Sequence, residues 1–215
     1  MRLTKLNNIN TKLIDELERK GYNSLISKIL VNRGYDEELI EALLNTGYAD
    51  EMPEYNDITN VEIGADIIES HIANSSTIYI FGDYDSDGVN SAYILGDAIN
   101  HVIYYSDSDA ELIIKLPERH EGYGLNMEWC KSIKKDNTLV ITVDNGIAQD
   151  KEVAYLLENG VDVLITDHHT PNGHTPKDVF IIDAFYNNES DDNKGLCGAG
   201  VAYKLAMTLL ERLNI

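Results

Sequence analysis

The sequence predicts an α/β fold, a parallel sheet flanked by helices with an N-terminal helical extension. From Thr77 onward, short runs of β-branched and aliphatic residues are apolar at successive positions rather than at alternate ones. Such strands are buried on both faces, which is typical of a parallel sheet covered by helices. Before Thr77, apolar residues recur only at helical spacing. We therefore expect a helical segment over residues 1–75 and an α/β domain over residues 76–215.

The N-terminal segment is expected to contain helices that pack on the core. Leu13 and Leu17 lie one helical turn apart, and a second apolar stripe covers residues 25–30. Asp36 is the expected N-cap of a third helix, with acidic residues in its first turn. Residues 48–58 are expected to form an exposed linker, and a further helix follows at about residues 60–73.

The second region alternates strands with helices, as parallel strands joined by helical crossovers require. The expected strands cover residues 77–81, 112–116, 138–143, 161–166 and 179–182. The expected helices lie at about residues 89–101, 126–135, 148–158 and 199–213.

Charge and composition exclude several classes of protein. The formal net charge of −20 does not fit a basic protein that binds nucleic acid by counterion release. The sequence has neither a long apolar run nor the apolar core of a signal peptide, so we expect a cytoplasmic protein without a membrane partner. The two cysteines are too few for a disulfide framework.

Three alternating aspartates, Asp83, Asp85 and Asp87, follow the first expected strand. Carboxylates this close repel one another unless a cation lies among them, and Mg²⁺ and Mn²⁺ prefer oxygen ligands. A solvated acidic turn or a calcium-loop look-alike is the alternative. The spacing and the strand-to-helix context do not fit an EF-hand.

Further ionisable residues follow two other strands. Asp144 comes after the strand over residues 138–143, and Asp167, His168 and His169 come at the end of the next one. A lone aspartate there is more often a helix cap, and a lone histidine more often a satisfied polar residue. Ligands of open parallel sheets bind at the carboxyl edge, so the aspartates and histidines converge on one site. Added histidine favours Mn²⁺, and two ions about 3.5–4 Å apart suit phosphoester hydrolysis.

These motifs resemble those of the DHH phosphoesterase superfamily. The matching segments are residues 83–88, 143–146 and 167–169. Residues 117–124, 196–204 and 32–34 are similar to segments of its RecJ branch, the single-strand-specific 5′→3′ exonucleases. The resemblance covers nearly the whole chain.

The resemblance implies a role for each matching residue. Asp83, Asp85, Asp87, Asp144 and His168 would be metal ligands, and Asp144 would bridge two ions of Mn²⁺ or Mg²⁺. Asp144, His168 and His169 would be catalytic. His169 would orient a ligand or meet the phosphate, and Asp167 and Asn145 would lie behind the ligands.

Two secondary sites are expected to bind substrate phosphate. Arg119, with His120, is a candidate clamp, and a surface salt bridge with Glu118 or Glu121 is the alternative. Gly198 and Gly200 open a helix whose backbone N–H groups could cradle a phosphate, with close helix packing as the alternative.

The chain also departs from the family pattern. Phe81 occupies a position where some relatives carry a histidine ligand. The family has a further aspartate ligand after the glycine-rich segment, whereas no aspartate follows Asp192 here and Asp183 is the candidate substitute. The smaller second domain (DHHA1-like) of the superfamily has no counterpart. We therefore expect weakened binding of the second metal and little nuclease activity in this chain alone, with a second lobe supplied in cis or trans.

Three functions remain open at this point. The first is a RecJ-like lobe that acts on single-stranded DNA or another nucleic acid, with replication or repair proteins as partners. The second is a phosphoesterase for short oligonucleotides, cyclic dinucleotides or pyrophosphate. The third is a non-catalytic interaction module.

Overall fold

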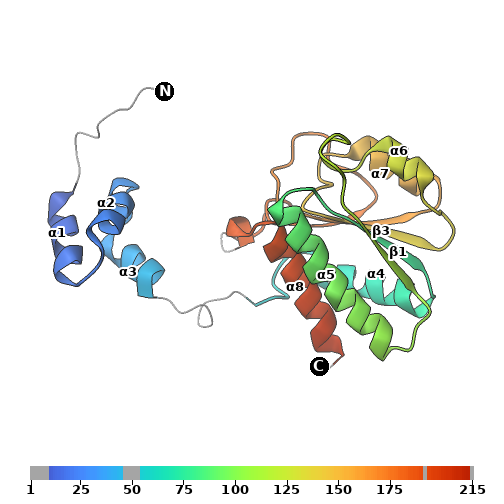
Figure 1. The fold of residues 1–215 in the computed structure, drawn as a ribbon, viewed down its shortest axis with the longest axis horizontal. Helices are drawn as coiled ribbons and strands as arrows, with labels where there is room; N and C mark the ends of the chain where they lie inside the picture. The colour runs from blue at the N-terminus through green and yellow to red at the C-terminus, as the bar shows by residue number, and fades with distance from the viewer. Residues whose placement is uncertain (1–9, 46–53, 191–192, 214–215) are drawn as a thin grey trace. The chain divides into compact units, whose positions relative to one another are not determined.

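The computed structural model describes residues 10–45, 54–190 and 193–213. The chain divides into two compact units, Met1–Met52 and Pro53–Ile215 (Figure 1). The expected linker over 48–58 lies partly outside the described residues. Glu54, Asn56 and Asp57 at its described end are exposed, as expected, whereas Ile58 is buried. Lys204 ties this end to the second unit, because it binds the Glu54 carbonyl and the Asp57 carboxylate.

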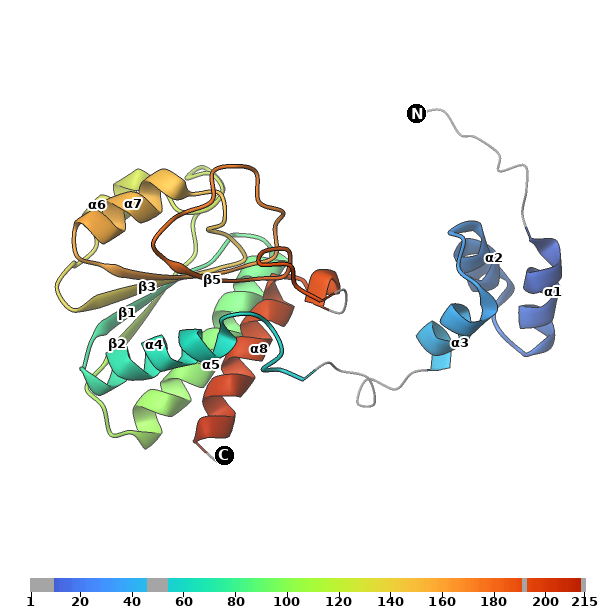
Figure 2. The same cartoon turned by 180° about the vertical axis from the view of Figure 1, so that it is seen from behind.

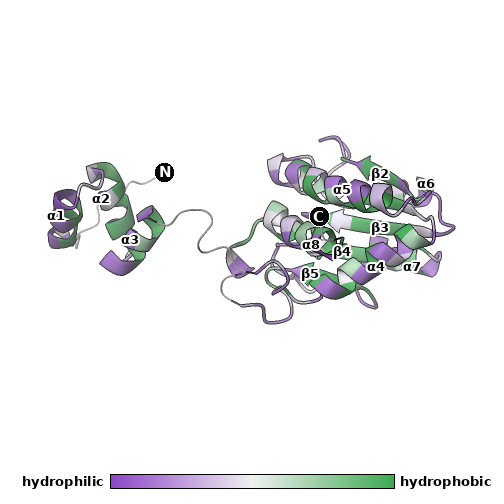
Figure 3. Cartoon of the chain, turned by 90° about the horizontal axis from the view of Figure 1, so that it is seen from below, coloured by the Kyte–Doolittle hydropathy of each residue, from purple (hydrophilic) through white to green (hydrophobic). Residues whose placement is uncertain are grey.

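The first unit contains three short helices, α1 (Thr11–Arg19), α2 (Ser24–Asn32) and α3 (Glu37–Asn45). Asn10 and Asn23 cap the first two helices through their side-chain oxygens. The unit has a small apolar core, made by Ile14, Leu17, Val31 and Ile40. Apolar residues continue along the outside of α2, as Figure 3 shows, and Leu25 is among those exposed.

The second unit is built on a five-stranded sheet with the order β2-β1-β3-β4-β5. All neighbouring strands are parallel, which confirms the predicted fold class. The strands are β1 (Thr77–Phe81), β2 (Glu111–Lys115), β3 (Thr138–Val143), β4 (Asp162–Asp167) and β5 (Phe180–Asp183).

Helices cover both faces of the sheet (Figures 1 and 2). One face packs on α4 (Val61–Ala73), α5 (Ser86–Tyr105) and α8 (Gly198–Arg212) through a core that includes Ile80 and Ile141. The other packs on α6 (Met127–Ser132) and α7 (Asp150–Glu158) through Phe81 and Val140. A short 3₁₀ turn, η1 (Asn193–Gly195), precedes α8.

The boundary between the units differs from the expected one at residue 75. The helix α4 belongs to the second unit, because Ile68 and Ile72 are buried in the core under the sheet. The division therefore falls between residues 52 and 53. Within the described part of the chain, no helix is both long and apolar enough to cross a membrane.

Candidate metal centre

The predicted metal ligands lie at the carboxyl ends of β1, β3 and β4, which are adjacent in the sheet. The chain passes from β1 to β2 on one side of it and then crosses to β3 on the other side. The strand order therefore reverses at β1. Ligands of open α/β sheets bind at such a switch point, because the loops after the strands diverge there.

The loop after β1 is held by its own helix. The Asp85 carboxylate accepts hydrogen bonds from the backbone N–H groups of Asp87 (2.8 Å) and Gly88 (3.1 Å), so Asp85 is the N-cap of α5. A Cβ at Gly88 would lie 2.5 Å from the backbone of Asp83, so only glycine lets the helix start this close. Asp83 is thereby buried at the foot of the loop, only 3% exposed.

The turn after β3 places Asp144 in the left-handed region, with φ at 60°. Its backbone N–H donates to the Thr166 carbonyl of β4. The next side chain, Asn145, donates from Nδ2 to the carbonyls of Phe81 and Val143, which ties β3 to β1. These bonds fix the turn, and Asp144 is 2% exposed within it.

At the end of β4, the buried Asp167 carboxylate organises the two histidines. Oδ1 accepts from the backbone N–H groups of His168 (2.7 Å) and His169 (3.2 Å), and Oδ2 accepts from that of Ile147 (2.9 Å). Asp167 Oδ1 also lies 2.7 Å from His169 Nδ1. These contacts fix the orientation of the His169 ring.

Two groups of potential metal ligands meet at Asp144. Among the described residues, Asp83, Asp85 and Asp144 form one group and Asp144, His168 and His169 the other, each with ligand atoms within 4.8 Å of one another. His168 Nε2 lies 3.0 Å from Asp144 Oδ1. Asp183 belongs to neither group, although it ends the neighbouring strand.

Asp87 has a different environment from the other two aspartates of its loop. Its carboxylate accepts from the backbone N–H groups of Gly198 and Ala199, both at 2.8 Å, at the start of α8. Oδ2 of Asp87 also lies 3.4 Å from His168 Nε2. The N–H groups expected to cradle a phosphate are therefore occupied by a carboxylate. A Cβ at Gly200 would lie 3.0 Å from the Leu196 side chain, so this glycine allows close packing of the helix start.

Burial and mutual repulsion dominate the electrostatics. Burial, together with the charges of Asp87 and Asp85, raises the pKa of Asp144 to about 7. Burial also raises the pKa of Asp83, and that of Asp183 to about 6. The hydrogen bond with Asp167 raises the pKa of His169 to about 8. The site concentrates negative charge that a cation would neutralise.

A divalent cation fits the oxygens that are present. Oδ1 of Asp83 and Oδ1 of Asp144 are buried, and neither accepts a hydrogen bond from any described residue. Buried carboxylate oxygens without donors are costly, whereas carboxylate and imidazole ligands together suit Mn²⁺ or Mg²⁺. The donor set therefore matches the predicted metal site.

Comparison with known proteins agrees with this geometry. The family model described as "DHH family, N-terminal domain" matches residues 77–214. The chain belongs to the DHH family. The single-stranded-DNA-specific exonuclease RecJ of Bacillus subtilis is 36% identical over 159 residues, which cover 73% of this chain and 20% of that protein. RecJ of Thermus thermophilus is 35% identical over 152 residues, or 70% of this chain and 22% of that protein.

Solved structures of RecJ exonucleases are also similar to this chain. A crystal structure of exonuclease RecJ bound to manganese has a TM-score of 0.65 at 31% identity, covering 76% of this chain and 40% of that one. The crystal structure of Thermus thermophilus RecJ in complex with Mn²⁺ has a TM-score of 0.63 at 25% identity, covering 95% and 28%. The DHH chain thus spans about a fifth of the length of the curated relatives named above.

The two residues of the predicted phosphate clamp, Arg119 and His120, have different surroundings in the structure. The Arg119 guanidinium lies over the ring of Tyr84, 5.6 Å from its centroid. Tyr84 stands between Asp83 and Asp85 in the loop after β1. Other side chains than Arg119 pair with the two glutamates of the alternative, since Glu118 contacts His120 and Glu121 contacts Lys115. His120 is exposed in that pair, outside both ligand groups.

Tyr123 is a further residue of the site, outside the motifs from which the site was predicted. Its hydroxyl donates to the Asp144 carbonyl (3.1 Å) and lies 3.2 Å from His169 Nδ1. Burial raises the pKa of Tyr123 far above its ordinary value, so the hydroxyl keeps its proton. The flanking Gly122 and Gly124, both with positive φ, give the loop the turn that brings Tyr123 inward, and they were the available sequence signal.

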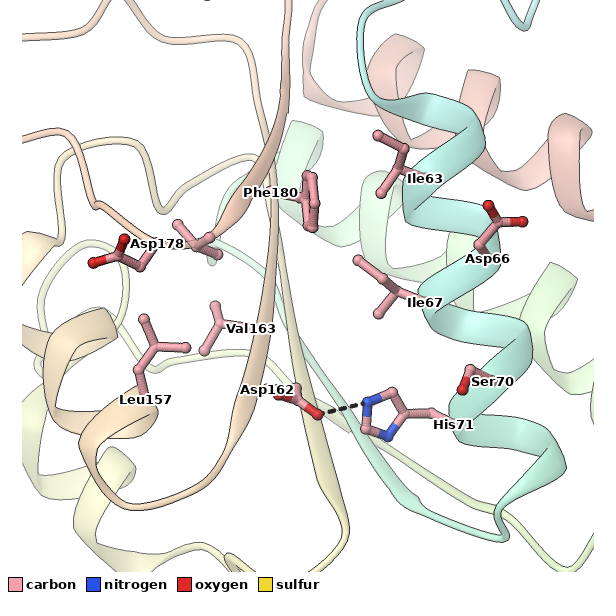
Figure 4. Close-up of a pocket in the computed structure, with 11 residues that line it drawn as sticks. Ile63, Asp66, Ile67, Ser70, His71, Leu157, Asp162, Val163, Asp178 and Phe180 are labelled. Atoms are coloured by element: carbon pink, nitrogen blue, oxygen red, sulfur yellow. Dashed lines mark hydrogen bonds and ion pairs between the residues drawn. The ribbon is translucent and has the colours of Figure 1, made fainter.

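Two hollows differ in their relation to the DHH site. One of about 240 Å³ lies beside the site and includes Tyr123, Asp167 and His169 in its lining. A larger one of about 430 Å³ lies between α4, α7 and the starts of β4 and β5 (Figure 4). There the His71 ring pairs with Asp162, the first residue of β4, so this hollow is at the opposite end of that strand.

Proposed function

We propose that the second unit is the metal-binding catalytic lobe of a RecJ-like exonuclease, which hydrolyses phosphodiester bonds of single-stranded DNA. One observation carries the proposal: the donor-free buried oxygen of Asp144 lies 3.0 Å from His168 and within one ligand group with Asp83, whose Oδ1 is also buried without a donor. The relatives named above are single-stranded-DNA-specific exonucleases, and two related structures contain Mn²⁺.

The residues divide naturally between two cations. Asp83 and Asp85 would hold one, His168 and His169 the other, and Asp144 belongs to both ligand groups. When bound, a pair of divalent ions supplies charge to the attacking and leaving oxygens of a phosphoryl displacement. Asp144 would therefore be the shared ligand, and its replacement would affect both positions.

The chain's own groups hold and orient protons around the site. Asp167 fixes the His169 ring through Nδ1, and the raised pKa of about 8 leaves this imidazole largely protonated near neutral pH before a cation binds. A protonated His169 can meet a phosphate oxygen, and a neutral one can offer Nε2 as a ligand. Tyr123, still protonated, donates to the Asp144 carbonyl and holds the turn.

Substrate binding must overcome the acidity of the chain. The whole chain has a net charge of −20, so the second unit would hold DNA through bound cations and a few cationic groups, of which Arg119 is placed beside the aspartate loop. We propose that a second lobe, in cis or trans, supplies most backbone contacts, and that the protein acts in the cytoplasm with replication or repair proteins. This division explains how an acidic lobe can belong to a nuclease.

The test is a digestion assay with Mn²⁺ on 5′-phosphorylated single-stranded DNA, matched duplex DNA and dinucleotides. We expect slow release of nucleotides from the single strand that stops with chelator and with Asp144→Asn. Cleavage restricted to dinucleotides would support a small-substrate phosphoesterase. Saturable Mn²⁺ binding without cleavage of any substrate, even when a second lobe is added, would contradict the nuclease and support an interaction module.

A further inference from the structure

The helix α8 is capped by a residue from a distant part of the chain. Its own N-cap residue, Cys197, makes no side-chain capping hydrogen bond with any described residue. Instead, Oδ2 of Asp87 accepts from Gly198 N–H and Oδ1 accepts from Ala199 N–H, each at 2.8 Å. Asp87 precedes these residues by 111 and 112 positions in sequence. Both oxygens of this carboxylate are therefore fixed by main-chain donors.

The start of α8 also lies against the shared ligand. A Cβ at Gly198 would be 2.6 Å from Asp144 Cβ and 2.7 Å from Asp144 Oδ1, so only glycine permits this approach. That same Oδ1 is buried and accepts no hydrogen bond from the described residues. Gly198 thus places the helix start beside an unpartnered carboxylate oxygen without offering a donor to it.

We propose that the first turn of α8 is a positioning element of the metal site, in which Gly198 and Ala199 act on the bound cations through Asp87. The inference rests on the proposed function and adds Asp87 to the metal ligands named there. A backbone N–H pair cannot rotate away as a side-chain donor can, so the Asp87 carboxylate stays oriented before a cation arrives.

The clamp leaves Asp87 able to bind a cation. A carboxylate has about four lone-pair positions, and the two N–H groups use one on each oxygen. The positive end of the α8 dipole favours the charged carboxylate. Oδ2 of Asp87, 3.4 Å from His168 Nε2, therefore faces the site with a free lone pair and a fixed direction.

The competing explanation is that Asp87 is only a helix cap. A cap stabilises α8 and the fold, but its weakening leaves the affinity of a neighbouring metal site unchanged. A positioning element changes metal affinity even when stability is matched. The distinction therefore requires a variant that removes one N–H and a control that perturbs the helix without removing it.

Ala199→Pro provides that variant, because the N–H of the second helical residue has no partner within the helix and proline is tolerated in the first turn. Ala199→Gly is the control, since it retains the N–H while lowering helix propensity. The measurements are Mn²⁺ affinity by calorimetry and thermal unfolding of the metal-free chain. We expect Ala199→Pro to bind Mn²⁺ about 10- to 100-fold more weakly than Ala199→Gly, the usual effect of losing a group that supports a metal ligand.

Equal Mn²⁺ affinities of the two variants would overturn the inference while leaving the proposed function intact. A wild-type chain that binds no Mn²⁺ would contradict the proposed function itself. If Ala199→Pro does not fold, amide hydrogen exchange in the metal-free wild type decides instead. We expect the Gly198 and Ala199 amides to be protected, and to lose protection in Asp87→Ala; unprotected amides in the wild type would overturn the clamp.

Discussion

The Asp144 carboxylate lies 3.0 Å from the His168 ring, yet no described residue donates a hydrogen bond to its Oδ1. The two side chains are near enough to share a cation, but they form no hydrogen bond with each other. A buried carboxylate in that state destabilises the metal-free fold, because ionisation has no compensating partner. The predictions below follow from this arrangement and from the groups around it.

The stability of the metal-free chain should depend on Asp144 in a pH-dependent way. Its pKa is raised from 3.8 to about 7 in the folded state, so the folded chain binds more protons than the unfolded one between these values. Stability therefore falls as pH rises from about 4 to 7, and the loss is complete above pH 7.

Asp144→Asn removes that loss. We expect it to raise the free energy of unfolding at pH 8, by at most about 4 kcal/mol at roughly 1.4 kcal/mol per pKa unit, and to leave it little changed at pH 4. Urea unfolding in chelator at both pH values measures the difference. A variant that is less stable than wild type at pH 8 would contradict the account.

His169 should titrate well above its ordinary range in the absence of metal. The hydrogen bond with Asp167 raises its pKa to about 8, and NMR of the imidazole protons reports the midpoint directly. This interaction stabilises the fold fully below pH 6.5 and is lost as pH rises through about 8. Asp167→Asn should lower the midpoint toward 6.5.

Asp183→Asn is the matched control for that titration, because Asp183 acts on His169 only through its charge. We expect it to shift the His169 midpoint less than Asp167→Asn does. An unchanged midpoint in Asp167→Asn would show that the 2.7 Å contact does not govern this ring.

Tyr123→Phe should destabilise the turn at Asp144 without creating a cavity in the core. The lost hydroxyl leaves the Asp144 carbonyl without its 3.1 Å donor, for an expected cost of about 0.5–1.5 kcal/mol. Thermal unfolding compares it with Tyr93→Phe, because Tyr93 on α5 is 69% exposed. Equal effects of the two substitutions would exclude a structural role for the Tyr123 hydroxyl.

Arg119 should recognise a terminal phosphate. Its guanidinium is supported by the Tyr84 ring beside the aspartate loop, and it can pair with phosphate oxygens in a bidentate manner. We expect Arg119→Lys to reduce the preference for 5′-phosphorylated over 5′-hydroxyl oligonucleotides in a binding titration with Mn²⁺. His120→Ala, in the exposed pair with Glu118, should keep the preference; its loss there would place the clamp at His120 instead.

Local pattern was sufficient for most of the fold. The five strands lie within one residue of their expected bounds, because uninterrupted apolar runs mark buried parallel strands. Helix starts were harder: α5 begins at Ser86, three residues before the expected start, because Asp85 caps it from within the aspartate motif. The expected helix to residue 135 ends at Ser132, since Ile133 turns extended and is buried.

The residue types of the site could be predicted from the sequence, whereas the contacts between them could not. Strand-end aspartates and histidines converge because parallel strands share one carboxyl edge. The bond from Gly198 to Asp87 joins residues 111 positions apart, and no local spacing encodes such a pairing. The same reason applies to Tyr123, whose partners Asp144 and His169 lie in the turns after β3 and β4 rather than in its own loop.

The central claim is that Asp144 is the shared ligand of a divalent-cation site. Calorimetric titration of the metal-free chain with Mn²⁺ at pH 8, for wild type and for Asp144→Asn, tests it most directly. We predict saturable binding by the wild type and affinity at least about 10-fold weaker in a folded Asp144→Asn chain. Equal binding by the two chains, or no binding by the wild type, would contradict the claim.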